Sequence, residues 1–306
     1  MTLKVAIGPS SFSSENDVPL RTLENAGVEI IPNPFGRRLN EEEIIRHLQD
    51  ADGLIAGLEP LNRRVLSSAP RLRAVARVGI GITNVDLEAA KDMEIKISST
   101  PDAPTEAVAE MTIACLLAIC RELARTNASM HSGRWQKSIG IGLKGTKVLI
   151  VGYGRIGQSF SHLLQPFGAK ILVTDPLLKG DLLKSGEHVV SFEQGLKEAQ
   201  VVSLHASGND LILGADAFDL MQDDVILLNS ARAELVDEDA LVTALKSGKV
   251  RSAWFDAFWE EPYTGRLLDF EQVLLTPHVA TYTRQCRFDM EMQAVENLLR
   301  DLGVNA

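Results

Sequence analysis

The fold is decided by residues 147–160, which read KVLIVGYGRIGQSF. In this stretch an apolar strand pattern runs directly into three spaced glycines and then into a helical pattern. Glycines at this spacing allow a tight turn, a close approach of the backbone to a pyrophosphate, and close packing of the helix on the strand. First-turn amides of the helix also carry partial positive charge. The stretch therefore predicts a dinucleotide-binding unit whose cofactor contacts come from Gly152, Gly154, Arg155, Ile156 and Gly157.

An acidic residue follows at the place where such a unit would bind a ribose. Asp175 ends the next strand pattern, KILVTD, 18 residues after Gly157. A carboxylate at this position accepts hydrogen bonds from the ribose hydroxyls and repels the 2′-phosphate of NADP. The spacing therefore predicts NAD as the cofactor. The alternative is a helix-capping or turn acid that precedes Pro176.

Short β-rich runs alternate with helical stretches on both sides of this motif. Such alternation predicts parallel sheets with helices on both faces, which is an α/β fold. Two doubly wound series follow each other: the first ends near Ser99, and the second opens at Thr100. We expect one long apolar helix over residues 105–130, a loop over 131–145, and a last helix over 284–302 that returns to the first series.

The composition narrows the possible classes of function. The 306 residues are 45% hydrophobic and 24% charged, as in globular proteins, and the formal net charge is −10. A negative charge of this size disfavours binding to nucleic acids and to anionic membranes. No stretch has transmembrane length and the N-terminus enters a strand pattern directly, so we expect a cytoplasmic protein. The three cysteines lack metal-ligand spacing, and we expect buried thiols and no metal site.

Four motifs carry a resemblance to a known family. They are VGYGRIG at 151–157, LNSARAELVDEDAL at 228–241, FDAFWEEP at 255–262 and LTPHVAT at 275–281. In this order they resemble the D-isomer-specific 2-hydroxyacid dehydrogenase family, which includes phosphoglycerate dehydrogenases, over nearly the whole chain. The resemblance implies a flavodoxin-like substrate domain formed by residues 1–99 plus 284–306, and a Rossmann NAD-binding domain formed by residues 100–283.

The same resemblance implies an NAD-dependent oxidoreductase. The family transfers a hydride between nicotinamide and C2 of a D-2-hydroxy acid or 2-keto acid. Hydride transfer to a ketone leaves an alkoxide unless a proton arrives, so the site needs an acid/base and a cation for the substrate carboxylate. The apolar helix expected over residues 105–130, together with the family, favours a homodimer. The remaining partner is a small-molecule substrate, with no nucleic acid and no membrane.

Motif positions imply the catalytic roles. His278 matches the proton donor and acceptor of the family, and Glu261 matches the acid that pairs with it and fixes its tautomer. Arg232 matches the arginine that holds the carboxylate and the keto oxygen, for which a planar guanidinium is suited. The alternatives are a surface or capping histidine, a solvated Glu261 beside Glu260, and an arginine in an ordinary salt bridge.

Further contacts are implied on the cofactor side. Asp256 matches an aspartate that the family places near the nicotinamide amide. His205 ends a strand pattern, and we favour packing or a cofactor contact for it. The main-chain groups expected to line the same pocket belong to Ala206, Ser230, Ala231 and Ala280.

On the substrate side, residues 76–86 match the glycine loop of the family. The amides of Val78, Gly79 and Ile80 are expected to bind the substrate carboxylate as a small anion nest. Arg77 precedes them, and its charge is expected to help bind the substrate.

The substrate itself stays open at this point. Arg77, Arg134 and Lys137 lie in segments where phosphoglycerate dehydrogenases meet the substrate phosphate, which favours 3-phosphoglycerate. Glyoxylate or hydroxypyruvate is the alternative, and the basic residues would then be surface or dimer-arm charges. An NADH-sensing corepressor-like binding protein is the rival from another class, which the retained catalytic residues disfavour. Trp259 replaces a smaller residue and is expected to narrow substrate choice.

Overall fold

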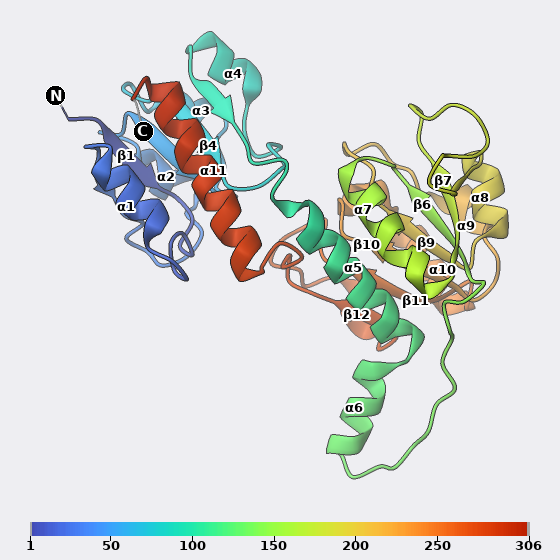
Figure 1. Ribbon diagram of the computed structural model, residues 1–306. Coiled ribbons are helices and arrows are strands. Elements are labelled where there is room, and N and C mark those ends of the chain that lie inside the picture. The colour runs from blue at the N-terminus through green and yellow to red at the C-terminus, as the bar shows by residue number, and fades with distance from the viewer. Residues whose placement is uncertain (1, 305–306) are drawn as a thin grey trace. The chain divides into compact units, whose positions relative to one another are not determined.

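The computed structural model describes residues 2–304 and separates into two compact units. Met1–Pro104 and Tyr282–Ala306 form the first unit, and Thr105–Thr281 forms the second (Figure 1). The sequence placed the boundaries at 99/100 and 283/284, and residues 1, 305 and 306 of its first domain lie outside the described residues. Each unit has helices around a parallel sheet, which confirms the predicted α/β class with two doubly wound domains.

The sheet of the first unit has five parallel strands in the order β2-β1-β3-β4-β5, which is the flavodoxin-like order. Its strands are β1 (Lys4–Ile7), β2 (Glu29–Ile31), β3 (Gly53–Ala56), β4 (Ala74–Arg77) and β5 (Lys96–Ser98). Its helices are α1 (Val18–Asn25), α2 (Glu41–His47), α3 (Arg63–Ser67), α4 (Leu87–Asp92) and α11 (Arg284–Leu302). The last helix has the bounds that the sequence predicted.

Helices cover both faces of this first sheet. Leu54 of β3 packs in a cluster with Ile44 of α2, whereas its neighbour Gly53 lies within contact distance of Leu298 of α11. Neighbouring strand residues point to opposite faces, so strands that are apolar at every position bury both faces. Four of the five helices begin where a side chain accepts a hydrogen bond from a first-turn amide: Asn40, Asn62, Asp86 and Thr283.

The sheet of the second unit has seven parallel strands in the order β12-β11-β10-β9-β6-β7-β8, which contains the Rossmann order. Its strands are β6 (Lys147–Val151), β7 (Lys170–Thr174), β8 (His188–Val189), β9 (Val201–Leu204), β10 (Val225–Asn229), β11 (Val250–Phe255) and β12 (Val273–Leu275). Its helices are α5 (Pro104–Cys120), α6 (Leu123–His131), α7 (Arg155–Leu164), α8 (Phe192–Glu198), α9 (Ala215–Leu220) and α10 (Glu238–Ser247).

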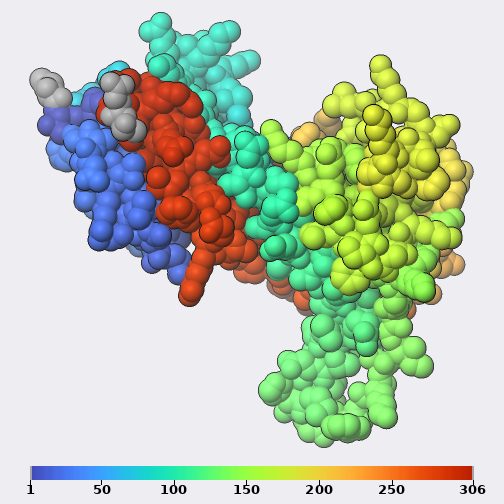
Figure 2. Space-filling model, viewed as in Figure 1, coloured from blue at the N-terminus to red at the C-terminus, as the bar shows by residue number. Residues whose placement is uncertain are grey.

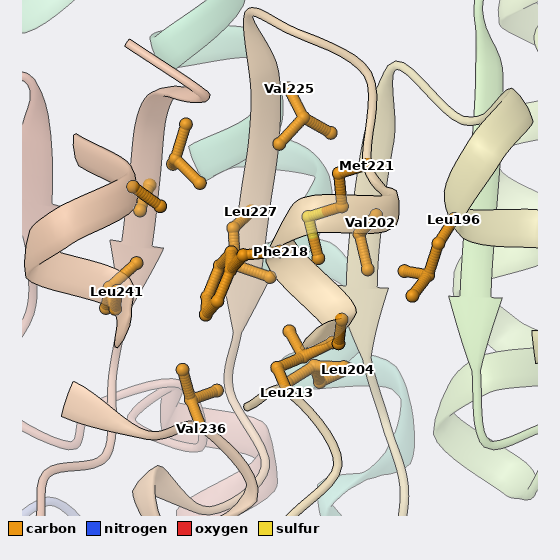
Figure 3. Close-up of a cluster of buried hydrophobic side chains, with 14 of the residues drawn as sticks. Leu196, Val202, Leu204, Leu213, Phe218, Met221, Val225, Leu227, Val236 and Leu241 are labelled. Atoms are coloured by element: carbon orange, nitrogen blue, oxygen red, sulfur yellow. The ribbon is translucent and has the colours of Figure 1, made fainter. Parts of the chain in front are cut away.

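Two hydrophobic cores cover the two faces of the second sheet. Figure 3 shows the first core, in which Val202 of β9 and Leu227 of β10 lie with Phe218 of α9 and Leu241 of α10. Ile226, the neighbour of Leu227, belongs instead to the second core, with side chains of α5 and α7. Alternation along the strands therefore places α8, α9 and α10 on one face and α5 and α7 on the other.

One predicted element is wrong. The single helix expected over residues 105–130 is two helices, α5 and α6, which are separated at Arg121 and Glu122. Glu122 adopts a left-handed φ of 51°, which ends the regular helix. The carbonyl of Cys120 accepts a hydrogen bond from the amide of Ile141 (2.8 Å), in the loop after α6. The break thus depends on a contact far along the chain, which a local helical pattern does not show.

Candidate active site

The predicted cofactor and catalytic residues of the second unit all follow the carboxyl end of a strand. The glycine motif follows β6, Asp175 follows β7, and Ala206 lies just beyond β9. The stretch with Arg232 follows β10, and the stretches with Glu261 and His278 follow β11 and β12. The strands are parallel, so these loops share one edge of the sheet, which is where α/β folds bind their ligands.

The turn between β6 and α7 is shaped by its three glycines. Gly152 has a φ of +90°, and a side chain there would lie 2.5 Å from the amide nitrogen of Ala206. A side chain at Gly157 would lie 2.3 Å from the carbonyl oxygen of Gly152. A side chain at Gly154, by contrast, would meet nothing within 4 Å. Two glycines are therefore required by the packing of the turn, and the third keeps open space at the start of the helix.

Helix α7 begins at Arg155, and Gly154 before it provides no side-chain cap. In the same unit, Ser191 and Asp237 cap α8 and α10 by accepting hydrogen bonds from first-turn amides. A helix start without a side-chain cap can bind an anion through its first-turn amides, which belong here to the segment of Arg155 and Ile156. The turn therefore combines open space with a partial positive charge.

Asp175 ties the end of β7 to this turn. Its Oδ2 accepts a hydrogen bond from the amide of Tyr153 and its Oδ1 from the amide of Leu177, each at 2.8 Å. Asp175 therefore has the turn role that was the alternative to ribose binding. Each carboxylate oxygen can accept a second hydrogen bond, so these bonds leave capacity for a ribose hydroxyl. The ribose contact stays a prediction.

His278 and Glu261 form a direct pair. The Nδ1 atom of His278 lies 2.9 Å from Oε1 and 3.1 Å from Oε2 of Glu261. The amide of Phe258 also donates to Oε1 of Glu261, at 3.2 Å. A carboxylate at Nδ1 selects the tautomer with a proton on that nitrogen, which leaves Nε2 to exchange a proton with another molecule. The His278 side chain is 38% exposed, so it is accessible for such an exchange.

Asp256 holds the chain on both sides of His278. Its buried carboxylate accepts hydrogen bonds from the hydroxyl of Thr276 (2.5 Å) and from the amides of Val279 (2.9 Å) and Ala280 (2.8 Å). His278 has a left-handed φ of 54°, a conformation that costs roughly 1–2 kcal/mol, and these bonds offset that cost. The sequence assigned Asp256 and Ala280 to the nicotinamide pocket. The hydrogen bonds show that Asp256 orders the histidine loop, and the nicotinamide contact stays a prediction.

The end of β10 is ordered by a buried asparagine that the sequence analysis missed. The side chain of Asn229 accepts from the amide of Ala231 (3.0 Å) and donates to the carbonyl of Arg232 (2.8 Å). The guanidinium of Arg232 donates from Nη1 to the carbonyl of Ala231 (2.7 Å). The hydroxyl of Ser230 is buried and has no hydrogen-bond partner within residues 2–304. The signal for Asn229 was its position as the last, polar residue of an otherwise apolar strand.

His205 packs beneath the glycine turn. Its Nε2 lies 2.8 Å from the hydroxyl oxygen of Ser203, and its ring centroid lies 5.1 Å from that of Phe160. Burial lowers the pKa of His205 to about 3, so its imidazole is neutral at physiological pH. These contacts correspond to packing, which is one of the two roles that the sequence favoured, and a cofactor contact stays a prediction. They give His205 no part in proton transfer at neutral pH.

The family assignment comes from comparison with known proteins. Residues 113–280 match the family described as D-isomer specific 2-hydroxyacid dehydrogenase, NAD binding domain. The chain belongs to the D-isomer specific 2-hydroxyacid dehydrogenase family. It is 33% identical over 271 residues to a glyoxylate reductase of Thermococcus litoralis, a match that covers 84% of this chain and 82% of that one.

Two further comparisons place this dehydrogenase in its family. It is 34% identical over 269 residues to D-3-phosphoglycerate dehydrogenase 2, chloroplastic, of Arabidopsis thaliana, which covers 84% of this chain. That match spans only 43% of the plant protein, so less than half of its length corresponds to this chain. The crystal structure of the TT0316 protein from Thermus thermophilus superimposes with a TM-score of 0.89 at 32% identity, and covers 98% of this chain and 97% of that one.

This D-2-hydroxyacid dehydrogenase is an NAD-dependent oxidoreductase, and the residues of its second unit fit the cofactor. The open space at Gly154 and the uncapped start of α7 suit a pyrophosphate. The buried hydroxyl of Ser230 lacks a partner within residues 2–304, so a cofactor polar group would satisfy it. When bound, the nicotinamide ring supplies or accepts the hydride.

The expected anion nest of the first unit needs correction. The amide of Val78 donates to the carbonyl of Ala56 (2.9 Å), and the amide of Gly79 donates to the hydroxyl of Thr100 (2.7 Å). Both amides are thus used by the sheet and by a buried threonine, and they do not form a nest. Arg77 lies over this loop, because a side chain at Gly79 would come within 1.3 Å of its Nη1. Arg77 and the amide of Ile80 remain as the substrate-side candidates.

Trp259 faces the interior of the second unit. Its Nε1 donates to the carbonyl of Val236 (3.1 Å), and its ring stacks on Phe255 with centroids 5.7 Å apart. These contacts give it a packing role, which differs from the substrate-narrowing role that we expected. Arg134 and Lys137 are exposed on the loop after α6.

Three further features bear on the sequence analysis. The cysteines Cys115, Cys120 and Cys286 are free and buried. Within residues 2–304, no group of three or more His, Cys, Asp and Glu side chains is arranged to hold a metal ion. None of the helices in that range combines the length and the apolar character that crossing a bilayer requires.

Proposed function

We propose that the chain interconverts a small D-2-hydroxy acid and its 2-keto acid, with His278 as the acid/base and Arg232 as the cation for the substrate. The observation that carries the proposal is the pairing of His278 Nδ1 with the Glu261 carboxylate at 2.9 and 3.1 Å. A carboxylate that orients a histidine through one ring nitrogen leaves the other nitrogen to exchange a proton with a bound molecule. Its loop is ordered separately by Asp256.

The residues then have distinct tasks in keto-acid reduction. Glu261 holds the imidazole through Nδ1, and Nε2 of His278 donates a proton to the oxygen at C2 as the hydride arrives at that carbon. Arg232 binds the carboxylate and polarises the keto oxygen through its planar guanidinium. In the oxidative direction, Nε2 accepts the proton from the hydroxyl group. Arg77 and the amide of Ile80 are further proposed contacts for a substrate carboxylate.

For the substrate, we propose a short unphosphorylated 2-keto acid such as glyoxylate or hydroxypyruvate. The support is the similarity to a glyoxylate reductase, which is 33% identical over 271 residues, and to a hydroxypyruvate reductase, which is 31% identical over 279 residues. The alternative is 3-phosphoglycerate, for which Arg77, Arg134 and Lys137 provide positive charge.

A turnover assay with a panel of 2-keto and 2-hydroxy acids tests both statements. NADH absorbance is followed with glyoxylate and hydroxypyruvate, with and without a 3-phosphate on the longer acid, in both directions. We expect the unphosphorylated acids to give the higher kcat/KM. A higher kcat/KM for the phosphorylated compounds would favour the alternative substrate. Tight NADH binding with no acid turned over at any pH would favour the corepressor-like class and contradict the proposed function.

We also propose that the protein is a cytoplasmic homodimer. Four large apolar side chains are exposed on α6 and the loop after it: Leu123, Met130, Trp135 and Ile139, which is 94% exposed. This segment stands out from the body of the second unit (green in Figure 2). A group of exposed apolar side chains on a projecting segment is typical of a surface that a second copy covers. The three free, buried thiols are consistent with a reducing compartment.

Sedimentation equilibrium at micromolar protein tests the oligomeric state. We expect a dimer for the wild type and a monomer for the variant with Trp135→Glu and Ile139→Glu, because a charge at either position opposes burial. A monomeric wild type would contradict the proposed dimer.

A further inference from the structure

A buried amide side chain closes the turn that carries Arg232. Asn229 is the last residue of β10 and is fully buried, and the other residues of that strand are apolar and buried. Its Oδ1 accepts a hydrogen bond from the amide of Ala231 (3.0 Å), and its Nδ2 donates to the carbonyl of Arg232 (2.8 Å). An apolar side chain would be buried here at a lower cost in free energy, so packing alone gives no reason for an asparagine. The reason lies in its two hydrogen bonds.

These two bonds lie on either side of the peptide group that holds the guanidinium. The carbonyl of Ala231 accepts a hydrogen bond from Nη1 of Arg232 (2.7 Å). Asn229 holds the preceding peptide group through the amide of Ala231 and the following one through the carbonyl of Arg232. Because each peptide group is planar, fixing both neighbours restricts the direction in which the Ala231 carbonyl points. The guanidinium is therefore held by an oxygen whose direction the asparagine sets.

The bond to Ala231 is compatible with binding a carboxylate. It uses Nη1 of the guanidinium. Nε and Nη2 lie on the opposite edge, where two parallel N–H groups match the two oxygens of a carboxylate. The main-chain carbonyl of Asn229 also accepts a hydrogen bond from the amide of Asp256 (3.1 Å), the residue that orders the His278 loop. Asn229 thus joins the arginine turn to the strand end from which the histidine loop is ordered.

A second asparagine makes the same kind of turn in the first unit. The Oδ1 atom of Asn33, two residues beyond β2, accepts a hydrogen bond from the amide of Phe35 (2.9 Å). Its Nδ2 donates to the carbonyls of Arg37 (2.9 Å) and Gly8 (2.6 Å). Asn33 has no assigned part in substrate or cofactor binding. It therefore gives a matched comparison in which the same contacts serve only the fold.

We propose that Asn229 is a positioning residue for Arg232. Its amide orders the turn so that the guanidinium is already oriented when a substrate carboxylate arrives, and less conformational freedom is lost on binding. The proposal rests on the proposed function, in which Arg232 binds the substrate. Asn229 itself is buried and acts through the arginine.

Steady-state kinetics of Asn229→Asp and Asn229→Leu with glyoxylate and NADH test the proposal. Both changes remove the donor that holds the Arg232 carbonyl. Aspartate keeps an acceptor for the Ala231 amide, and leucine adds no charge. We expect kcat/KM for glyoxylate to fall by roughly tenfold in each variant, mainly through KM, because the restraint of a hydrogen bond is lost. The dissociation constant of NADH should stay within about threefold of the wild-type value, since the glycine turn after β6 is untouched.

An Arg232→Ala background separates positioning from a merely structural role. If Asn229 acts through Arg232, Asn229→Leu causes no further fall in kcat/KM when the arginine is absent. The control is Asn33→Asp, which makes the same chemical change in the matched turn and should leave kcat/KM unchanged. Thermal unfolding of each variant verifies that it folds.

Three results would overturn the proposal while Arg232→Ala lowers kcat/KM, as the proposed function requires. The first is a wild-type kcat/KM in Asn229→Leu. The second is an equal fall caused by Asn229→Leu with and without the arginine, which would make the effect independent of Arg232. The third is a fall in Asn33→Asp as large as that in Asn229→Asp, which would make it a general effect of a disrupted turn. A wild-type kcat/KM in Arg232→Ala would instead contradict the proposed role of the arginine itself.

Discussion

Two loops of the second unit differ in how they are shaped. The turn between β6 and α7 is defined by missing side chains, with open space at Gly154 and no cap on the helix. The segment around His278, after β12, is defined by side-chain contacts. Asp256 accepts hydrogen bonds from residues before and after His278, and Glu261 pairs with the imidazole ring. The contrast teaches that the two loops are ordered independently, and it supports the proposal that cofactor binding and proton transfer are separate functions of them. A substitution should therefore remove one and spare the other.

The largest expected effect comes from breaking the second loop. His278→Asn removes the proposed proton donor, and kcat should fall by about 10²–10⁴-fold, the usual contribution of a general acid/base. The dissociation constant of NADH, measured by fluorescence titration, should stay at the wild-type value because the glycine turn is untouched. A joint loss of kcat and NADH affinity would show that the two loops are not independent.

A substitution at the first loop should have the opposite effect, with weaker cofactor binding and an unchanged kcat. Asp175→Ala should weaken NADH binding by roughly tenfold and reduce the preference for NADH over NADPH, because the proposed ribose acceptor and its repulsive charge are both lost. At saturating NADH, kcat should be close to the wild-type value. Asp175→Asn is the matched control: it keeps an acceptor for the turn and removes only the charge. Unchanged discrimination between the two cofactors in both variants would remove Asp175 from the ribose role.

A smaller effect, on stability, should come from the acid that anchors α7 to the segment before β8. Burial opposes ionisation of Glu187, but hydrogen bonds from Ser161 (2.6 Å) and Ser185 outweigh it and lower its pKa to about 2. The folded-state pKa lies below the ordinary value of 4.5, so the ionised group stabilises the fold above that pH. This stabilisation is lost as the pH falls from about 4.5 toward about 2.

Glu187→Gln should therefore lower the free energy of unfolding by about 2 kcal/mol at pH 7, the value of hydrogen bonds to a charged group. The corresponding decrease in Tm should shrink as the pH falls through the acidic range. Scanning calorimetry of this variant and of Glu193→Gln, an exposed acid on α8, measures it. An equal decrease at pH 7 and at pH 3 would contradict the role of the ionised carboxylate.

The smallest effect is expected from Trp259→Phe. The phenylalanine keeps most of the packing and loses the hydrogen bond to the carbonyl of Val236, which should cost about 1 kcal/mol of stability. Urea unfolding gives this difference, and the substrate panel should give wild-type ratios of kcat/KM. A changed substrate preference would instead support the narrowing role that the sequence suggested.

The parts that the sequence predicted well are those fixed by local chemistry. The glycine turn could be predicted because close backbone contacts require glycine at Gly152 and Gly157. The predicted bounds of α11 agree with the structure, where Thr283 caps one end and Gly303 follows the other in a left-handed conformation. The alternating apolar runs predicted both parallel sheets.

The parts that the sequence missed depend on partners far along the chain. The amide of Gly79 is used by Thr100, and the carboxylate of Asp256 is used by Thr276 and its neighbours, 20 or more residues away. The break at Glu122 likewise accompanies a contact from a distant loop. Local patterns carry no information on such pairings, and the resemblance assigned Asp256 a role without showing its hydrogen bonds.

The central claim is that this protein moves a hydride from nicotinamide to C2 of a 2-keto acid. Mass spectrometry of the product formed from glyoxylate and NADH doubly deuterated at C4 tests it most directly. We predict glycolate that carries one deuterium on C2. Unlabelled glycolate, or no product while the labelled NADH remains bound and unchanged, would contradict the account.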